Sequence, residues 1–272
     1  MNDFSISARS LVRSLVSHRA LLFELVKREI SARYKGSVLG VVWSLVTPVL
    51  MMAVYTFVFS VVFKARWSTE SQSKTEFALV LFAGLMVFNL FSDSISRAPF
   101  LIQSSTNYVK KVVFPLEILP LVSLGGSLFH LSVNFLVWLL FYGIFVGIPP
   151  LTVGLFIFII APLVFLTLGL SWFLASLGVY VRDIGQVIGV CLSVLLFMSP
   201  IFYPLSALPT HVKPWLAVNP ITQVVEWVRD ILLWGVVPSF PTYSAYLASS
   251  ALVAWLGYAW FQKTRKGFAD VI

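Results

Sequence analysis

Charged side chains are scarce in this chain. Asp, Glu, Lys and Arg make up 11% of its 272 residues, whereas hydrophobic residues make up 59% and the mean hydropathy is +0.93. Soluble domains carry roughly 25% charged residues, and a soluble core of this length cannot hide so many apolar side chains. The apolar runs are long, unlike the ~10-residue alternating segments of an outer-membrane barrel. The sequence therefore predicts an all-α protein that crosses a membrane several times.

Patterns that bind nucleotides, metals or cofactors are also missing. Cys191 is the single cysteine, so one chain cannot form a disulfide or a cysteine-based metal site. No Gly-x-x-x-x-Gly-Lys-Ser/Thr loop occurs, and no clustered acids, Cys/His ligands or nucleophile with a base are apparent. We therefore expect no catalytic residue, no metal and no cofactor in this chain. If the protein moves a substrate uphill, a partner must supply the energy.

Six apolar runs are long enough for membrane-crossing helices, which need ~20 residues. They cover residues 38–63, 77–95, 116–148, 151–181, 184–203 and 242–261. In this topology 14 of the 19 lysines and arginines lie on the side that holds both termini. Because basic residues collect on the cytoplasmic side of membrane helices, we expect both termini in the cytoplasm. The net charge of +8 then reflects topology, and no nucleic-acid partner is expected. Residues 20–23 are too short an apolar run for the core of a cleavable signal peptide, so the first span should direct insertion.

A charged helix is expected before the first span, over residues 20–35. Its polar face would carry Glu24, Lys27, Arg28, Ser31 and Lys35, and its opposite face Leu22, Leu25, Val26 and Ile30. Such a helix is suited to lie in the headgroup plane of a membrane, or to present its charges to a partner. Gly36 should end it.

Two connections between spans are too regular to be plain loops. Residues 97–114, on the cytoplasmic side, carry Gln103, Asn107, Lys110 and Lys111 between apolar residues, which indicates a short amphipathic element. On the outer side, residues 206–235 are broken by prolines and then predict a helix that Asn219 caps and Pro220 begins. We interpret this stretch as an interfacial or re-entrant hairpin.

Polar and aromatic side chains recur at helical spacing within the spans. Ser123, Ser127, His130 and Asn134 form one stripe, which suits interhelical hydrogen bonding or the wall of a transport path or protomer interface. Tyr55, Phe59 and Phe63 form another, which suits lipid anchoring, core packing or a platform for sugar rings. Asp93 and Arg97 have the spacing of a helical ion pair, either a clasp or a gating pair.

A set of short motifs runs in order along nearly the whole chain, from about Leu21 to Lys266. They are Leu25-Val26-Lys27-Arg28-Glu29-Ile30, Arg33-Tyr34-Lys35, Leu39-Gly40, Trp43-Ser44-Leu45-Val46-Thr47-Pro48, Tyr180-Val181-Arg182-Asp183, Ser199-Pro200-Ile201-Phe202-Tyr203 and Asn219-Pro220. This order resembles the membrane (permease) subunits of bacterial type 2 ABC exporters, particularly those that export O-antigen, capsule or teichoic-acid polysaccharides.

The resemblance implies an assembly and a location. Two permease chains would pair in the bacterial inner membrane above two copies of a P-loop ATPase, which would hold ATP and Mg²⁺. Residues 20–35 would be the interface helix, 97–114 the coupling helix and 206–235 the outer gate. Contacts with the ATPase would come from Lys27, Arg28, Arg33, Asn107, Lys110, Lys111, Arg182 and Asp183.

The same resemblance implies a substrate, an undecaprenyl-diphosphate-linked polysaccharide that crosses from the inner to the outer leaflet. We expect Arg33, Lys35 and Arg97 to meet its diphosphate, because fixed cations suit phosphate oxygens. The glycan path would use Tyr55, Phe59, Phe63, Ser123, Ser127, His130 and Asn134.

Three other classes of function remain open. The first is export of teichoic acid, capsule or a drug-like amphiphile, which would use the same architecture. An ion-coupled secondary carrier is disfavoured, because such carriers show inverted repeats and acids at the membrane midplane. An intramembrane transferase would need clustered acids or a metal site.

Overall fold

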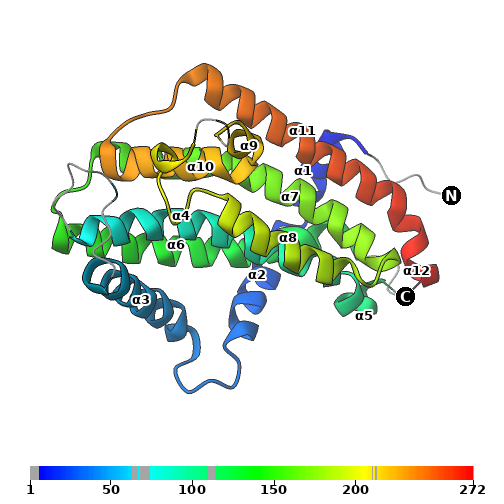
Figure 1. Ribbon diagram of the computed structural model, residues 1–272. Helices are drawn as coiled ribbons and strands as arrows, with labels where there is room; N and C mark the ends of the chain where they lie inside the picture. Colours follow the sequence, from blue (N-terminus) through cyan, green and yellow to red (C-terminus); the bar gives the residue numbers. More distant parts are fainter. Residues whose placement is uncertain are drawn as a thin grey trace.

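The computed structural model describes residues 6–62, 67, 74–109, 114–209, 211 and 213–271, which form helices joined by short turns and contain no strand. Figure 1 shows the helices in the order of the chain. The α-helices are α1 (Ala8–Ser17), α2 (Arg19–Arg33), α3 (Trp43–Tyr55), α4 (Lys74–Arg97), α5 (Thr106–Val109), α6 (Leu119–Phe145), α7 (Phe156–Tyr180), α8 (Ile184–Met198), α9 (Lys213–Val218), α10 (Pro220–Arg229), α11 (Phe240–Thr264) and α12 (Phe268–Val271).

Tighter and wider helical turns extend several of these helices. The 3₁₀ turns are Gly40–Val42, Ala98–Phe100, Gln103–Ser105, Leu116–Ile118, Leu151–Leu155, Leu205–Ala207 and Arg265–Gly267. The π-helical segments are Thr56–Val62, which continues α3, and Asp230–Trp234, which continues α10.

Four helical segments are long and apolar enough to cross a membrane. They are Gly40–Phe59, Glu76–Phe100, Leu116–Phe145 and Leu151–Tyr180, and α8 is a shorter apolar helix. The remaining expected run, 242–261, falls within α11, which has 25 residues. The described chain is thus all-helical with four candidate spans, and the count of six stays a prediction.

The fifth expected run is longer than its helix. Residues 184–203 were expected to be one span, but α8 ends at Met198 and Ser199 is extended, with ψ at 144°. Pro200 explains the end, because the residue before a proline is pushed out of the helical region.

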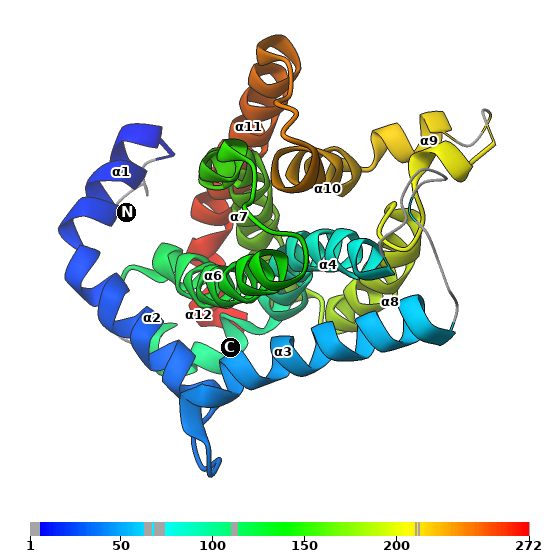
Figure 2. The ribbon, with the colours of Figure 1, turned by 90° about the vertical axis from the view of Figure 1, so that its left-hand side faces the viewer.

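Helix α4 is the centre of the bundle. In its most apolar stretch 83% of the residues are buried, against 17% in the α3 segment. Figure 2 shows α4 surrounded by α3, α6, α7, α8 and α10, and each of these helices contacts it. The indole nitrogen of buried Trp138 donates a hydrogen bond to the Leu79 carbonyl at 3.1 Å and ties α6 to α4.

Helices α7 and α11 cross with their backbones in contact. A Cβ atom on Gly257 would lie 2.0 Å from the Gly169 carbonyl oxygen, and one on Gly169 would lie 2.5 Å from the Val253 carbonyl oxygen. Only glycine fits at these two positions, so α7 and α11 pack against each other at the closest distance that their backbones allow.

The charged helix expected over residues 20–35 is α2, and the chain leaves it at a turn in which Gly36 has φ +85°. The side chains of the predicted apolar face are half-buried, those of the predicted polar face are exposed, and α2 packs on α6. Val26 lies against Gly125 of α6, where a Cβ would be 2.6 Å from a Val26 methyl. The short helix α1 before it was not predicted.

Both ends of the described chain lie at one end of the bundle, together with α5 and α12, whereas α10 turns towards α11 at the opposite end (Figure 1). Helix α5, in the segment expected to contact a partner, therefore lies at the other end of the bundle from the turn between α10 and α11, where the hairpin expected on the outer side ends.

Candidate functional site

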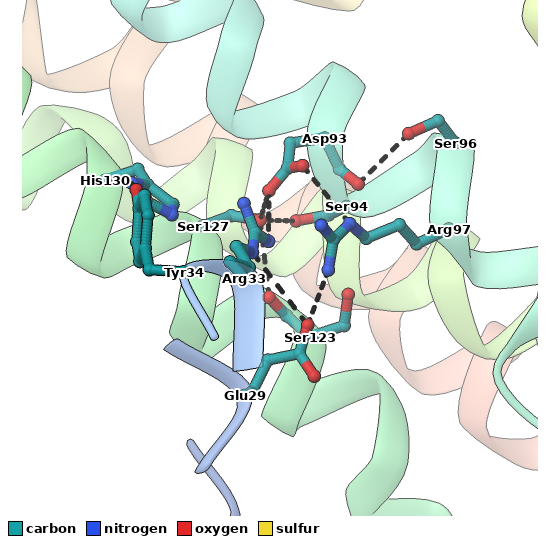
Figure 3. Close-up of polar contacts among 10 residues, drawn as sticks. All are labelled: Glu29, Arg33, Tyr34, Asp93, Ser94, Ser96, Arg97, Ser123, Ser127 and His130. Atoms are coloured by element: carbon teal, nitrogen blue, oxygen red, sulfur yellow. Dashed lines mark hydrogen bonds and ion pairs between the residues drawn. The ribbon is translucent and has the colours of Figure 1, made fainter. Parts of the chain in front are cut away.

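Four charged side chains join α2 to α4. Arg33 donates to Asp93 Oδ2 at 2.7 Å, and Arg97 donates to Glu29 Oε1 at 2.5 Å. Within α4, Arg97 Nε lies 3.3 Å from Asp93 Oδ1, which confirms the predicted helical ion pair. Arg33 Nε lies 3.9 Å from Glu29 Oε1 and closes the ring. We call these four residues the charge cluster (Figure 3).

Two serine hydroxyls join the same cluster, Ser127 from α6 and Ser94 from α4. Ser127 donates to Asp93 Oδ2 at 2.6 Å and accepts a hydrogen bond from Ser94 at 3.0 Å. The two carboxylates, the two guanidinium groups and these hydroxyls form a network that has no net charge and joins α2, α4 and α6. Separating α2 from α4 would break the Arg33–Asp93 and Arg97–Glu29 pairs and leave each arginine with the acid of its own helix.

A cavity of about 490 Å³ lies beside the charge cluster, bounded by the end of α2 and by α3, α4 and α6. Its charged lining residues are Arg33 and Asp93, which pair with each other. Its other polar and aromatic lining residues are Tyr34, Trp43, Ser44, Thr47, Tyr55, Asn89, Ser92, Ser96, Ser127, His130 and Asn134. The size is within the ~300–1,000 Å³ range of small-molecule sites.

The structure brings together part of the predicted glycan path. Tyr55, Ser127, His130 and Asn134 all line the cavity. Ser123 is buried and lines a smaller hollow of about 220 Å³ between α2, α6 and the stretch after α4. Phe59 instead stacks on Phe77, with ring centroids 5.2 Å apart. Phe63 lies outside the described residues.

The residues predicted to meet the diphosphate differ in their surroundings. Arg33 and Arg97 belong to the charge cluster, with side chains 16% and 37% exposed. Lys35 is exposed and lies in the turn after α2. An anionic ligand must therefore compete with Asp93 and Glu29 for the two arginines, whereas Lys35 has no ion pair among the residues that the structure describes. Their role in binding diphosphate stays a prediction.

The turn of Tyr34 sits against α6. Its hydroxyl lies 3.4 Å from His130 Nδ1, and the two rings meet edge to face with centroids 6.0 Å apart. Burial raises the pKa of Tyr34 above its ordinary value, so the phenol stays neutral at physiological pH. Within the described part of the chain the other imidazole nitrogen, His130 Nε2, is buried without a hydrogen-bond partner.

Five of the residues predicted to contact an ATPase are exposed. Lys27 and Arg28 lie on α2, Asn107 on α5, and Arg182 and Asp183 in the turn between α7 and α8. Arg33 is turned into the charge cluster instead. Lys110 and Lys111 lie outside the described residues.

The expected coupling element, 97–114, is a series of short turns where it is described, and it packs on the end of α7. A Cβ on Gly178 would lie 2.0 Å from the Pro99 carbonyl oxygen, so this contact requires glycine. Gln103 donates to the Gly178 carbonyl at 2.5 Å. Phe100 lies against Gly185 of α8. The element therefore contacts α7 and α8 directly.

Arg229 was not recognised as important from the sequence. It is on α10 with 0% exposure, and its guanidinium donates to the carbonyls of Val80, Pro200 and Ile201 at 3.1, 2.5 and 2.9 Å. It also pairs with Glu226 at 2.9 Å. The predicted Asn219 cap is confirmed, because its side chain accepts from the Ile221 amide at 2.9 Å. Arg229 thus fastens the hairpin to α4 and to the end of α8.

Burial shifts the pKa values of the charged side chains in this segment. Burial and the nearby Glu226 raise the pKa of Asp230 to about 6, and burial also raises the pKa of Glu226, against the attraction of Arg229. Burial lowers the pKa of Arg229 to about 10, which still leaves it charged at neutral pH. This segment lies outside the four candidate spans.

A second ion pair that the sequence did not indicate joins the tail to the 3₁₀ turn before α6. Arg265 donates to Glu117 Oε2 at 2.7 Å and to the Phe114 carbonyl at 2.8 Å. Ser14 of α1 donates to Glu117 Oε1 at 2.9 Å. No sequence spacing relates these residues, since they lie about a hundred positions or more apart.

Comparison with known families places the chain in a class. The profile of the ABC-2 type transporter family matches residues 20–233, so the chain belongs to this family of membrane transport proteins. This confirms the resemblance found in the sequence motifs.

Individual relatives are named as polysaccharide export permeases. The chain is 30% identical to the O-antigen export system permease protein RfbA of Myxococcus xanthus, over 96% of this chain and 99% of that protein. It is 25% identical to the protein of the same name from Klebsiella pneumoniae, over 93% and 95%. It is 23% identical to the polysialic acid transport protein KpsM of Escherichia coli, over 84% and 87%.

Proposed function

We propose that this chain is the membrane subunit of an ATP-driven exporter that moves an undecaprenyl-diphosphate-linked, O-antigen-like polysaccharide across the bacterial inner membrane, from the cytoplasmic to the outer side. The observation that carries the proposal is the similarity, over 96% of the chain, to an O-antigen export permease. Because the sequence has no P-loop, ATP and Mg²⁺ would bind a separate ATPase subunit, and this chain would hold no cofactor.

The working assembly would contain two copies of this chain and two copies of the ATPase. Six spans, with α8 and α11 as the fifth and sixth, would leave both termini in the cytoplasm. Two observations support this orientation: most basic residues fall on that side, and both ends of the described chain lie together with α5 (Figure 1). Nothing in the charge pattern calls for a nucleic-acid partner.

Movement of the ATPase would reach the spans through two routes. The first is α2, whose exposed Lys27 and Arg28 would contact the ATPase and whose Glu29 and Arg33 are bonded to α4. The second is the coupling element with the 180–183 turn, which packs on α7 and α8 through Pro99 and Phe100. The hairpin of residues 206–235, fastened by Arg229, would close the outer side.

The diphosphate would meet Arg33, Lys35 and Arg97 near the cytoplasmic side. Phosphate oxygens would replace carboxylate oxygens on the two arginines, and Asp93 would keep the Ser127 hydroxyl. Lys35 allows the cleaner test, since replacing it leaves the charge cluster intact. Lys35→Gln should weaken binding of undecaprenyl diphosphate severalfold, whereas Lys27→Gln on the exposed face of α2 should not; equal binding by the two variants would remove Lys35 from the site.

The first experiment is deletion of the gene, with separate analysis of surface polysaccharide and of intracellular undecaprenyl-linked glycan. An exporter of finished polymer predicts loss outside together with accumulation inside, and both should be restored by the wild-type gene. Replacing the P-loop lysine of the partner ATPase should give the same pattern. An unchanged surface glycan in the deletion strain would reject the polysaccharide function and favour a drug-like amphiphile.

Capsule or teichoic-acid export is the second candidate. The similarity to a polysialic acid transport protein favours capsule specifically. Chemical analysis of the glycan that accumulates in the deletion strain separates the three polymers.

A further inference from the structure

The cavity beside the charge cluster is lined mostly by uncharged side chains. Among the described residues that line it, Arg33 and Asp93 are the ones with a full charge, and they are bonded to each other at 2.7 Å. Asp93 is further engaged by Arg97 and by the Ser127 hydroxyl. A free cation would meet a carboxylate already neutralised, and a free anion would meet an arginine already paired. The wall therefore favours an uncharged occupant.

The same wall offers hydrogen-bonding groups that are unused. Within the described part of the chain, the side-chain amides of Asn89 on α4 and Asn134 on α6 make no hydrogen bond, and both line the cavity. Each amide can donate two hydrogen bonds and accept two. Nearby, the buried Nε2 of His130 is without a partner. An occupant that donates and accepts hydrogen bonds would satisfy these groups, whereas a hydrocarbon chain that covered them would leave them unpaired.

Aromatic rings complete the lining. Tyr34, which lies beside His130 (Figure 3), lines the cavity at the end of α2, and Trp43 and Tyr55 line it from α3. Amides that bond hydroxyl groups, together with rings that cover apolar C–H faces, match the chemistry of a sugar ring. The volume of about 490 Å³ is in the range of small-molecule sites.

We infer that this cavity binds an uncharged sugar residue of the lipid-linked glycan, with Asn89 and Asn134 bonding its hydroxyl or acetamido groups and Trp43 and Tyr55 covering its apolar face. The inference rests on the proposed function and deepens it. It assigns the recognition of sugar to a place between α3, α4 and α6 within one chain. It also places that recognition beside Arg33, which is proposed to meet the diphosphate of the same lipid.

The test uses the complete complex of permease and ATPase in nanodiscs and two lipid probes. One probe is undecaprenyl diphosphate, and the other is the same lipid carrying one N-acetylhexosamine, which adds an uncharged sugar. Asn134→Leu and Asn89→Leu remove hydrogen-bonding groups at nearly constant volume. Each should weaken binding of the sugar-carrying lipid about tenfold and leave binding of undecaprenyl diphosphate within about twofold.

The matched control is Ser132→Leu. Ser132 is exposed on α6 outside the cavity lining, and its hydroxyl bonds only the Leu128 carbonyl of its own helix within the described residues. This variant should bind both probes as the wild type does. If the cavity variants lose affinity for both probes alike, or for neither, the sugar site is wrong. Failure of the wild-type complex to bind either probe would instead reject the proposed function.

A second measurement does not depend on loss of binding. With Cys191 replaced by serine, the Asn134→Cys variant carries one thiol in the cavity. A small neutral maleimide should label it, and the sugar-carrying lipid should slow labelling at least fivefold, whereas undecaprenyl diphosphate should not. Equal labelling rates with the two lipids would overturn the inference.

Discussion

The buried guanidinium of Arg229 predicts the largest loss of stability from a single substitution. Arg229→Ala would leave the carbonyls of Val80, Pro200 and Ile201 without their donor and Glu226 without its cation. Removing one partner of a buried charged network costs about 3–5 kcal/mol. Folded domains are stable by only about 5–15 kcal/mol, so this one side chain secures a large share of the total.

The assay is thermal unfolding in nanodiscs at a fixed scan rate. A loss of about 4 kcal/mol corresponds to a fall in apparent Tm of about 10 °C for a chain of this size. Arg229→Lys keeps the charge but offers three donors from one atom, so it should fall between wild type and Arg229→Ala. Arg182→Ala, at an exposed arginine in the turn after α7, should stay within about 0.5 kcal/mol of wild type. An Arg229→Ala protein as stable as Arg182→Ala would refute the reasoning.

Three further predictions concern contacts around the same helices. Gly84→Ala should lower the free energy of unfolding by about 1–3 kcal/mol, because the new methyl would lie 2.7 Å from a guanidinium nitrogen that other bonds hold in place; Gly143→Ala, in open space on α6, is the control. A double-mutant cycle with Glu117→Gln and Arg265→Gln should show coupling of about 1–3 kcal/mol, and additivity would disprove the pairing. Asp230 has a folded pKa of about 6, above the ~3.9 of an unfolded chain, so the folded state favours the protonated side chain. The stability that this preference contributes is complete below about pH 4 and is lost as the pH rises through 6. Asp230→Asn should therefore raise Tm more at pH 7.5 than at pH 5, and an equal shift at both would contradict the assignment.

Features that depend on neighbours in the sequence could be predicted. The cap at Asn219 with Pro220 in the first turn follows from local hydrogen bonding, and the Asp93 and Arg97 pair follows from one helical turn. The end of α2 near Gly36 is also local, since a residue with positive φ ends the helix. Long apolar runs are local features too, and four of the six expected runs correspond to candidate spans.

Features that depend on distant partners could not be predicted. Arg229 reads as an ordinary polar residue of α10, because its acceptors are backbone carbonyls of α4 and of the turn after α8, and any sequence supplies carbonyls. The closing of Arg33 on Asp93 across sixty positions is likewise invisible in spacing. The cavity was predictable in part. Its α6 members shared a predicted stripe, but the neutral charge of its wall appeared only when α2 was packed against α4.

The crossing of α7 and α11 has a mechanical consequence. At Gly169 and Gly257 the two backbones touch, and a slide by one residue would drive a side chain into a main chain. The pair therefore has one permitted register, so a movement of either helix along its axis must carry the other with it. The α3 segment is held differently, because only 17% of its most apolar stretch is buried, it contains Pro48 and it continues as a π-helix. We therefore expect a rearrangement of the bundle to shift α3 before it changes the fit of α7 on α11.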